Sequence, residues 1–501
     1  MTFSFWFLLV LGIITYIMVQ RSVARITRTP VWLLWLVLMA PTILLSVWMS
    51  LNKGRQQPPP QLMFWSLIIC PILYWVLFQW GRRSEVPKDP QSEQKNPERR
   101  NLAIPLTPLD NNPTPEPVRP IEPSEEAQLR NCFPWSVYYI QNIEYRPQAV
   151  ICRGQLRIAA NSAYKEVKEN IEAQFGDRFL VVFQEGLNGK PFFVLVPNAQ
   201  AASRNTIEQE KLTRPGLALL LVFVTLVTTT WVGVQIAGVP LRSIPSNPNL
   251  MLRGLPYALG LMTVLGTHEL GHYLTARYYK IRATLPYFIP MPLFLGTFGA
   301  FIQMRSPVPN RKALFDVSVA GPLAGFIITL PILVWGLTQS QIVPLGDKTG
   351  LLNHNALNPR YSILLAFISK LALGSKLEPS MAIDLHPIAV AGFLGLIVTA
   401  LNLMPVGQLD GGHIVHAMFG QRTAIVVGQI ARLCLLVLSF IQSEFLLWAV
   451  IILFLPLIDE PALNDVSELD NQRDFLGLLT MALLILIILP LPQFLAGWLR
   501  I

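Results

Sequence analysis

Long apolar segments, separated by polar ones, dominate the hydrophobic pattern of the chain. A helix needs about 20 apolar residues to cross the hydrocarbon core of a bilayer. Continuous apolar runs favour helices over the strands of a membrane barrel, which alternate between apolar and polar residues. The pattern therefore predicts an all-α polytopic membrane protein with about ten transmembrane helices, at residues 3–19, 31–50, 62–78, 215–234, 254–276, 313–338, 386–404, 424–440, 445–458 and 475–494.

One apolar stretch, residues 285–304, does not fit a regular helix. It contains three prolines, which break helices, and two glycines, which add flexibility: Pro286, Pro290, Pro292, Gly296 and Gly299. At membrane depth, broken backbone is tolerated only where protein or a water-filled cavity covers it. We therefore expect a re-entrant β-hairpin or loop here, with an ordinary broken helix as the alternative.

Two polar regions lie between the third and fourth apolar segments. Residues 81–130 contain ten prolines and no aromatic residue, which predicts an extended, disordered linker. Residues 131–200 are rich in strand formers on both sides of one amphipathic helical stretch, and so predict a small soluble α+β domain. That domain has no catalytic constellation, so we expect it to bind a regulatory partner.

The resulting domain order has five parts. Residues 1–80 form three transmembrane helices, 81–130 the linker, 131–200 the small domain, 215–458 the main helical core, and 459–501 an acidic loop with a C-terminal transmembrane helix. We interpret the acidic loop, residues 459–474, as a solvated cytoplasmic face.

Composition and charge agree with a membrane location. The 501 residues are 52% hydrophobic and only 14% charged, too apolar for an average soluble domain. We attribute the net charge of +9 to topology and lipid contact rather than to nucleic-acid binding. Basic residues follow the segment 254–276, so its C-terminal end should face the cytoplasm. The four cysteines include no Cys-x-x-Cys pair, which argues against a cysteine zinc site.

A candidate catalytic motif lies near the end of the segment 254–276. His268 and His272 are spaced i and i+4, so on a helix both imidazoles can reach one metal ion, with Glu269 beside them as a general base. Polar groups at membrane depth are costly and indicate a functional site by default. The alternative is a hydrogen-bonded histidine pair that braces neighbouring helices.

A third metal ligand is expected on a segment that returns to the same depth. Asp410 lies just past the segment 386–404 and is the best candidate, and His413 and His416 are its rivals. The alternative for these two is that they are surface histidines after a helix end. Asn402 could hold a substrate carbonyl or a developing oxyanion, or could simply cap its helix.

These residues support hydrolysis of an amide bond. Glu269 would take a proton from a zinc-activated water and pass it to the leaving amine. A substrate helix must unwind first, because its carbonyls are hydrogen-bonded. A strand edge within residues 285–304 could hold the unwound segment by β-augmentation.

The pairing of the 268–272 motif with residues 402–411 resembles the site-2 protease family of intramembrane zinc metalloproteases. The run at 296–299 and the small-residue stripe at 321–325 are also similar to family features, and the N-terminal helices, linker and small domain resemble the cyanobacterial and chloroplast EGY-type branch. The resemblance implies one Zn²⁺ per chain, a catalytic base, and substrate-binding residues. Its metal ligands would be His268, His272 and Asp410, its base Glu269, and its substrate-binding residues Asn402, Gly296 and Gly299.

The expected substrates are membrane proteins cut within or beside a transmembrane helix. The chain is expected to be an integral multi-pass protein, of the plasma or thylakoid membrane if cyanobacterial, with its site toward the cytoplasmic side. Two other functions stay open from the sequence. A membrane transporter or metal permease could use the same His and Asp residues for passing ions, and a non-catalytic scaffold could use the small domain to recruit partners.

Overall fold

The computed structural model describes residues 29–51, 121–146, 148–186, 189–198, 214–240, 243–244, 246–291, 295–344, 357–378, 381–441, 445–499 and 501, with isolated residues between 12 and 80. The chain divides into two compact units, Met1–Asn111 and Asn112–Ile501. In the first unit, the apolar run at 31–50 forms helix α2, Val31–Leu51, with Pro41 inside it. The predicted spans at 3–19 and 62–78 and the linker residues 81–120 lie outside the continuously described ranges.

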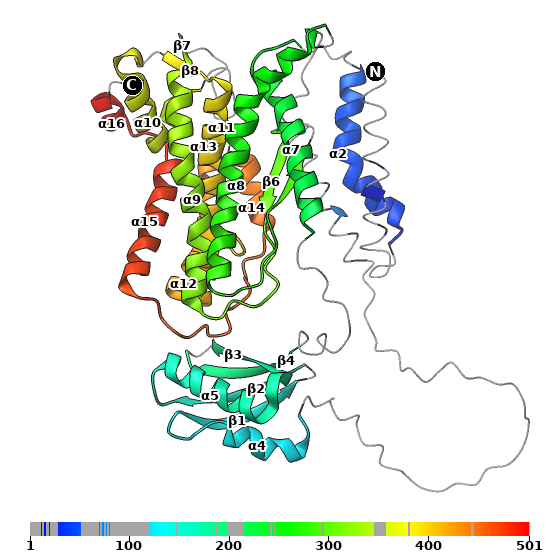
Figure 1. Cartoon of the computed structure of the whole chain (residues 1–501), viewed down its shortest axis with the longest axis vertical. Coiled ribbons are helices and arrows are strands. Elements are labelled where there is room, and N and C mark those ends of the chain that lie inside the picture. Colours follow the sequence, from blue (N-terminus) through cyan, green and yellow to red (C-terminus); the bar gives the residue numbers. More distant parts are fainter. Residues whose placement is uncertain are drawn as a thin grey trace, which may run out of the picture. The chain divides into compact units, whose positions relative to one another are not determined.

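The second unit begins with a small α+β domain. Its four strands form one antiparallel sheet in the order β1-β2-β4-β3, with β1 at Tyr138–Arg146, β2 at Ala149–Leu156, β3 at Phe179–Glu185 and β4 at Pro191–Pro197. Helix α5, Ala160–Phe175, lies against this sheet (Figure 1). Its apolar face, with Tyr164, Val167 and Ile171, packs into the domain's core.

The small domain begins earlier than its sequence indicates. Residues assigned to the linker form a helical turn, η1 at Pro123–Glu125, and a short helix, α4 at Glu126–Asn131. Ile121 and Leu129 are almost fully buried in the domain's core. These two apolar residues are surrounded in the sequence by charged residues and prolines, so composition alone did not reveal that the segment is folded.

A bundle of helices forms the rest of the second unit. Five described helices are long and apolar enough to cross a membrane, at Pro215–Ile236, Pro248–Tyr278, Arg311–Thr338, Gln421–Phe440 and Asn471–Ile488. The helices of this bundle are α7 (Pro215–Ile236), α8 (Leu255–Tyr278), α9 (Arg311–Thr338), α10 (Ile363–Leu373), α11 (Pro387–Leu403), α12 (Asp410–Phe419), α13 (Gln421–Ile441), α14 (Leu446–Phe454), α15 (Asn471–Ile488) and α16 (Gln493–Leu499). The chain is therefore mostly helical, as expected for a membrane protein.

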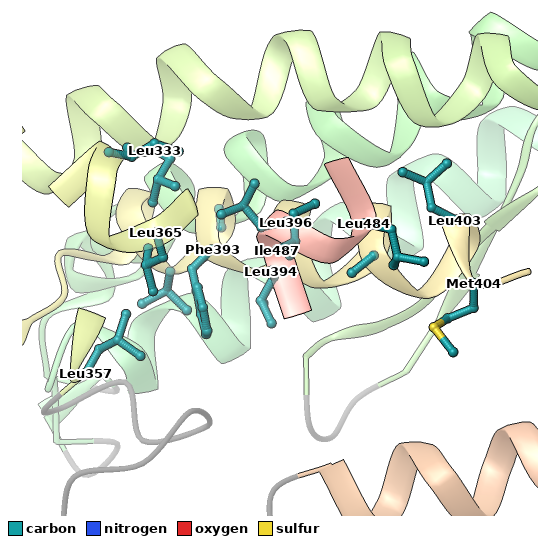
Figure 2. Close-up of a cluster of buried hydrophobic side chains, with 14 of the residues drawn as sticks. Leu333, Leu357, Leu365, Phe393, Leu394, Leu396, Leu403, Met404, Leu484 and Ile487 are labelled. Carbon is teal, nitrogen blue, oxygen red and sulfur yellow. The ribbon is translucent and has the colours of Figure 1, made fainter. Parts of the chain in front are cut away.

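Helix α11 occupies the centre of the bundle. It is only 17 residues long, but most of its residues are buried against α8, α9 and α15. Figure 2 shows part of the surrounding core, in which Phe393 and Leu396 of α11 lie near Leu365 of α10 and Ile487 of α15. A helix that is apolar on all sides must be enclosed in this way or face lipid. Because α11 is enclosed, its C-terminal end has a fixed position, from which the chain continues to Asp410.

The proline-rich stretch forms an antiparallel hairpin, as expected. Strand β5, Tyr287–Pro290, pairs with β6, Thr297–Phe301. The turn is fastened to the bundle, because the Thr228 hydroxyl donates to the Gly296 carbonyl at 2.7 Å and the Tyr257 hydroxyl donates to the Leu295 carbonyl at 2.9 Å. The hairpin is thus held at a fixed place beside α7 and α8.

Two regions differ from their sequence-based interpretation. The hydrophobic pattern predicts no element between the spans at 313–338 and 386–404, but this region contains helix α10 and a two-stranded sheet, β7 (Gln341–Pro344) with β8 (Met381–Asp384). Helix α10 has only 11 residues, including Ser369 and Lys370, too few to be recognised as a span. The acidic loop at 459–474 is not fully solvated, because Asp459, Asn464 and Asp465 are each at most 5% exposed.

Candidate metal centre

Three side chains from two distant parts of the sequence converge between α8 and α12. Asp410 Oδ2 lies 3.5 Å from His268 Nε2 and 3.3 Å from His272 Nε2, and the two imidazole nitrogens are 3.1 Å apart. One ligand atom from each residue lies within 4.8 Å of the others. The structure therefore brings together the three predicted metal ligands, and two imidazoles with one carboxylate form a set that suits a catalytic zinc.

The tautomer of His272 is fixed by helix α9. Its Nδ1 lies 2.7 Å from the Val317 carbonyl, which can only accept a hydrogen bond, so Nδ1 carries the proton. The lone pair of Nε2 is then directed toward His268 and Asp410. Such a backbone partner is the usual means of orienting a metal-binding histidine.

Helix α9 also makes room for both imidazoles. A Cβ atom added at Gly321 would lie 2.1 Å from His272 Nε2, and one at Gly325 would lie 3.2 Å from His268 Cβ. Across the same contact, a Cβ at Gly271 of α8 would lie 2.6 Å from the Ala320 carbonyl oxygen. The small-residue stripe of α9 thus lets the two helices approach closely and leaves space for the two rings.

Asp410 is held by the tight connection between α11 and α12. Helix α11 ends at Leu403, and Asp410 is the first residue of α12. Gly407 in the connection has φ +50°, and a Cβ there would lie 1.8 Å from the Pro456 carbonyl oxygen. Within α12, a Cβ at Gly411 would lie 2.0 Å from the Leu403 carbonyl oxygen. These two glycines allow a short connection between α11 and α12 that places Asp410 beside the two histidines.

Asn402 and Glu269 lie beside the three ligands. The Asn402 amide nitrogen lies 3.3 Å from His268 Nε2, so this side chain faces the metal-binding atoms. Glu269 follows His268 on α8 and is partly buried, and the backbone N–H of Ile302, just past β6, interacts with its carboxylate. The hairpin therefore reaches the candidate base.

The two glycines predicted to bind substrate belong to the hairpin. Gly296 has φ +83°, and a Cβ there would lie 2.5 Å from Thr229 Cα, so this residue packs on α7 rather than on the metal ligands. Gly299 has φ +106° and lies in β6. Both glycines adopt left-handed backbone conformations that other residues rarely tolerate.

The rival ligands His413 and His416 point into a second polar cluster. His413 Nδ1 lies 2.9 Å from Asp459 Oδ2, and His416 Nδ1 lies 2.7 Å from the same oxygen. His416 is fully buried, so its interpretation as a surface histidine is wrong. Asp459 lies 43 residues along the chain from His416, and no local sequence pattern links them.

Comparisons with known proteins cover both the small domain and the helical core. Residues 256–441 match the family described as Peptidase family M50, and residues 127–203 match the EGY3 middle domain. No solved structure matches significantly.

Several chloroplast proteins are similar to this chain. The probable zinc metalloprotease EGY2 of Arabidopsis thaliana is 31% identical over 365 residues, which cover 72% of this chain and 63% of the relative. The probable zinc metalloprotease EGY1 of the same plant is 35% identical over 238 residues, 47% of this chain and 43% of the relative. EGY3 of Oryza sativa subsp. japonica is 26% identical over 383 residues, 72% of this chain and 64% of the relative.

The chain spans less than two thirds of the length of these relatives. The matches nevertheless include the His-Glu-x-x-His helix, the Asp410 turn and the small domain. The resemblance inferred from the two motifs is confirmed: residues 256–441 match Peptidase family M50, and the chain is similar to the EGY-type proteins of chloroplasts.

Proposed function

We propose that this chain is an intramembrane zinc metalloendopeptidase that hydrolyses peptide bonds within or near transmembrane helices of membrane protein substrates. One observation carries the proposal. The two imidazoles of a helix long and apolar enough to cross a membrane converge with the Asp410 carboxylate of α12 within 4.8 Å, and Glu269 lies beside them. The names of the similar EGY proteins, probable zinc metalloproteases, support the same reaction and the same metal.

The residues present fit one Zn²⁺ per chain. His268, His272 and Asp410 would hold it, and the Val317 carbonyl and the space at Gly321 already orient His272 for that role. Three protein ligands leave a coordination position for water or substrate. When bound, zinc supplies the Lewis acidity that makes water nucleophilic at neutral pH.

Glu269 would move the protons of the reaction. Its carboxylate follows the first metal ligand on α8, and the Ile302 backbone N–H beside it limits its freedom. It would accept a proton from the attacking water and later donate one to the leaving amine. Asn402, whose amide nitrogen lies 3.3 Å from His268 Nε2, would donate a hydrogen bond to the oxygen of the scissile carbonyl as negative charge develops there.

The β5–β6 hairpin would hold the unwound substrate. It is a two-stranded sheet whose second strand ends next to Ile302 and Glu269, and Phe298 in that strand is 70% exposed. A substrate segment could add a strand to the hairpin through backbone hydrogen bonds. This pairing would expose the carbonyl groups of the substrate to the metal centre. In an intact substrate helix, the same carbonyl groups are hydrogen-bonded within the helix.

The membrane arrangement follows from length and charge. Five described helices meet the criterion for a span. The five other apolar segments of the sequence, at 3–19, 31–50, 62–78, 386–404 and 445–458, would bring the total to ten. Basic residues after α8 would place its metal-binding end toward the cytoplasm of a plasma or thylakoid membrane. Membrane lipids would surround the bundle, and the small domain would bind a regulatory partner.

The direct test is the substitution Glu269→Gln in full-length protein. It keeps the shape of the side chain and leaves the three metal ligands unchanged. We expect zinc content to stay close to one per chain, while the cleavage rate of single-span membrane substrates falls by about 10²–10⁴-fold, the usual contribution of a general acid–base. The exposed Glu378→Gln, outside the site and the segment 459–466, is the matched control and should cleave normally. Cleavage at the parental rate by Glu269→Gln would remove the proposed mechanism.

A further inference from the structure

A second cluster of charged side chains lies on α12, one and a half turns beyond Asp410. At its centre is His416, which is fully buried. Its Nδ1 lies 2.7 Å from Asp459 Oδ2, and its Nε2 lies 3.0 Å from Asp465 Oδ2. Ionised carboxylates can only accept hydrogen bonds, so both ring nitrogens carry protons and the ring is an imidazolium.

Other polar groups complete this cluster. His413 Nδ1 lies 2.9 Å from Asp459 Oδ2, Arg311 Nε lies 3.4 Å from Asp465 Oδ1, and Gln421 Nε2 donates to the Asp459 carbonyl at 3.1 Å. These contacts fasten the segment 459–465 to the first turns of α9 and α13 and to α12.

The electrostatic surroundings agree with an imidazolium between two carboxylates. Burial alone would lower the pKa of His416, but its hydrogen bonds to Asp459 and Asp465 outweigh burial and raise the pKa to about 9. Burial would raise the pKa of Asp459, but the hydrogen bonds from His413 and His416 hold it at about 2. The cluster therefore stays charged near neutral pH.

The same segment forms part of the small domain. Phe183 of the edge strand β3 donates its backbone N–H to the Leu463 carbonyl at 2.7 Å and accepts one from Asp465 at 2.8 Å. Leu463 also packs against the domain's apolar core, as does Val466. Residues 463–465 thus cover the edge of β3, which would otherwise present unpaired backbone groups.

On its other side, the segment binds the chain that leads into α9. Leu463 donates to the Val308 carbonyl at 2.9 Å, and Asn464 donates to the Pro309 carbonyl at 3.1 Å. Helix α9 then supplies the carbonyl that orients His272 and the space for both imidazoles. Through its backbone and side chains, the segment therefore contacts the small domain, the start of α9 and helix α12.

We propose that residues 459–466 form a strap that couples docking of the small domain to the metal centre, with His416 as the positioning residue that holds α12, and so Asp410, in place. Removing His416 leaves two buried carboxylates without their shared cation. This change loosens α12 at one end and the strap on β3 at the other. The identity of the metal rests on the proposed function, whereas the coupling between α12 and β3 does not.

The test is His416→Gln in the full-length protein in detergent, with two measurements. Zinc affinity is measured by competition with a chelator, and amide hydrogen exchange is measured in α12 and in β3. His416 acts on Asp410 through α12 rather than by direct contact. We expect zinc to bind about tenfold more weakly, the lower end of the effect of losing a group that orients a metal ligand directly. We also expect faster exchange in Phe179–Glu185, although this strand does not contain the substituted residue.

A control separates positioning from a general loss of stability. Tyr138→Phe removes the hydroxyl that donates to the carbonyls of Cys152 and Pro191, and so destabilises the small domain away from the strap. It should leave zinc affinity unchanged. Asp465→Asn keeps the shape of the side chain and carries the test if His416→Gln does not fold. It should weaken zinc binding in the same direction.

Two results are decisive. If His416→Gln and Asp465→Asn bind zinc within twofold of the parent and β3 exchanges at the parental rate, the strap does not couple the two parts. A parent protein that binds no zinc would instead count against the proposed function. In that case, unchanged exchange in β3 of the variants would overturn the coupling, and faster exchange would support it.

Discussion

Single glycine residues decide whether the metal ligands can approach one another. His272 is oriented by one backbone carbonyl and faces Gly321 of α9, where a Cβ atom would lie 2.1 Å from its metal-binding nitrogen. Real Cβ atoms are not found at such distances, so one extra carbon must move either the ring or the helix. The glycine is therefore part of the site, although it provides no ligand.

We predict that Gly321→Ala weakens zinc binding by at least about tenfold, because the added methyl group displaces the imidazole of His272 from its position. A competition titration with a zinc chelator measures the effect. Gly216→Ala is the control, since Gly216 is also helical but has open space around its Cβ position. Equal zinc affinity in the two variants would show that the site tolerates the displacement.

The two histidines could be predicted from the sequence, whereas their surroundings could not. The spacing of His268 and His272 is a local property of one helix, so it is visible in five consecutive residues. The prediction of Asp410 as a ligand required the inference that a later segment returns to the same depth in the membrane as His268 and His272. His416 and Asp465 are 49 residues apart, and only the packed structure brings them together.

At the scale of elements, the strap joins segments that no local pattern connects. Its acidic composition is typical of a solvated loop, yet Asp459 and Asp465 are buried because the side chains of Arg311, His413 and His416 bind their carboxylates. Helix α10 was not predicted because its 11 residues, which include Ser369 and Lys370, are too few to mark a span. Elements stabilised mainly by tertiary contacts are therefore the ones that sequence patterns failed to reveal.

The charges of the strap predict how its stability depends on pH. The pKa of His416 is raised from 6.5 to about 9, so its stabilising effect is complete below pH 6.5 and is lost as the pH rises through 9. The pKa of Asp459 is lowered from 3.8 to about 2, so its effect is present above pH 3.8 and is lost only as the pH falls through 2. Asp465 faces the same ring, and Arg311 binds the other carboxylate oxygen of Asp465.

We therefore expect the difference in Tm between the parent and His416→Gln to be largest near pH 5–6 and to shrink toward pH 9.5. Thermal unfolding in detergent, with a zinc chelator present, measures this difference without a contribution from the metal centre. A difference that stays constant or grows between pH 6.5 and 9.5 would mean that the imidazolium does not stabilise the junction.

At the scale of the whole molecule, the number of membrane spans depends on which apolar segments cross the bilayer. The direction of each span depends on the basic residues that flank it. The helical class and the hairpin followed from the hydrophobic pattern, because run length and proline content are directly readable. The exact number of spans did not follow from the pattern. Short helices such as α11 are enclosed by other helices, so their length does not show whether they cross the membrane.

The proposed orientation can be tested with reporters. Arginines follow the first and third apolar segments and would place residues 81–120 on the cytoplasmic side. We expect a cytoplasm-dependent reporter inserted there to be active and a reporter that requires export to be inactive. The opposite pattern would reverse the proposed orientation of the metal centre.

The central claim is that one divalent cation is bound by two imidazoles of α8 and the carboxylate that begins α12. X-ray absorption spectroscopy of the zinc-loaded protein tests it most directly. We predict first-shell scattering from two imidazole nitrogens at about 2.0–2.1 Å and from oxygen at about 2.0–2.2 Å, with the imidazole signature lost in a His268→Ala, His272→Ala variant. A sulfur shell near 2.3 Å, or a spectrum unchanged by that double substitution, would contradict it.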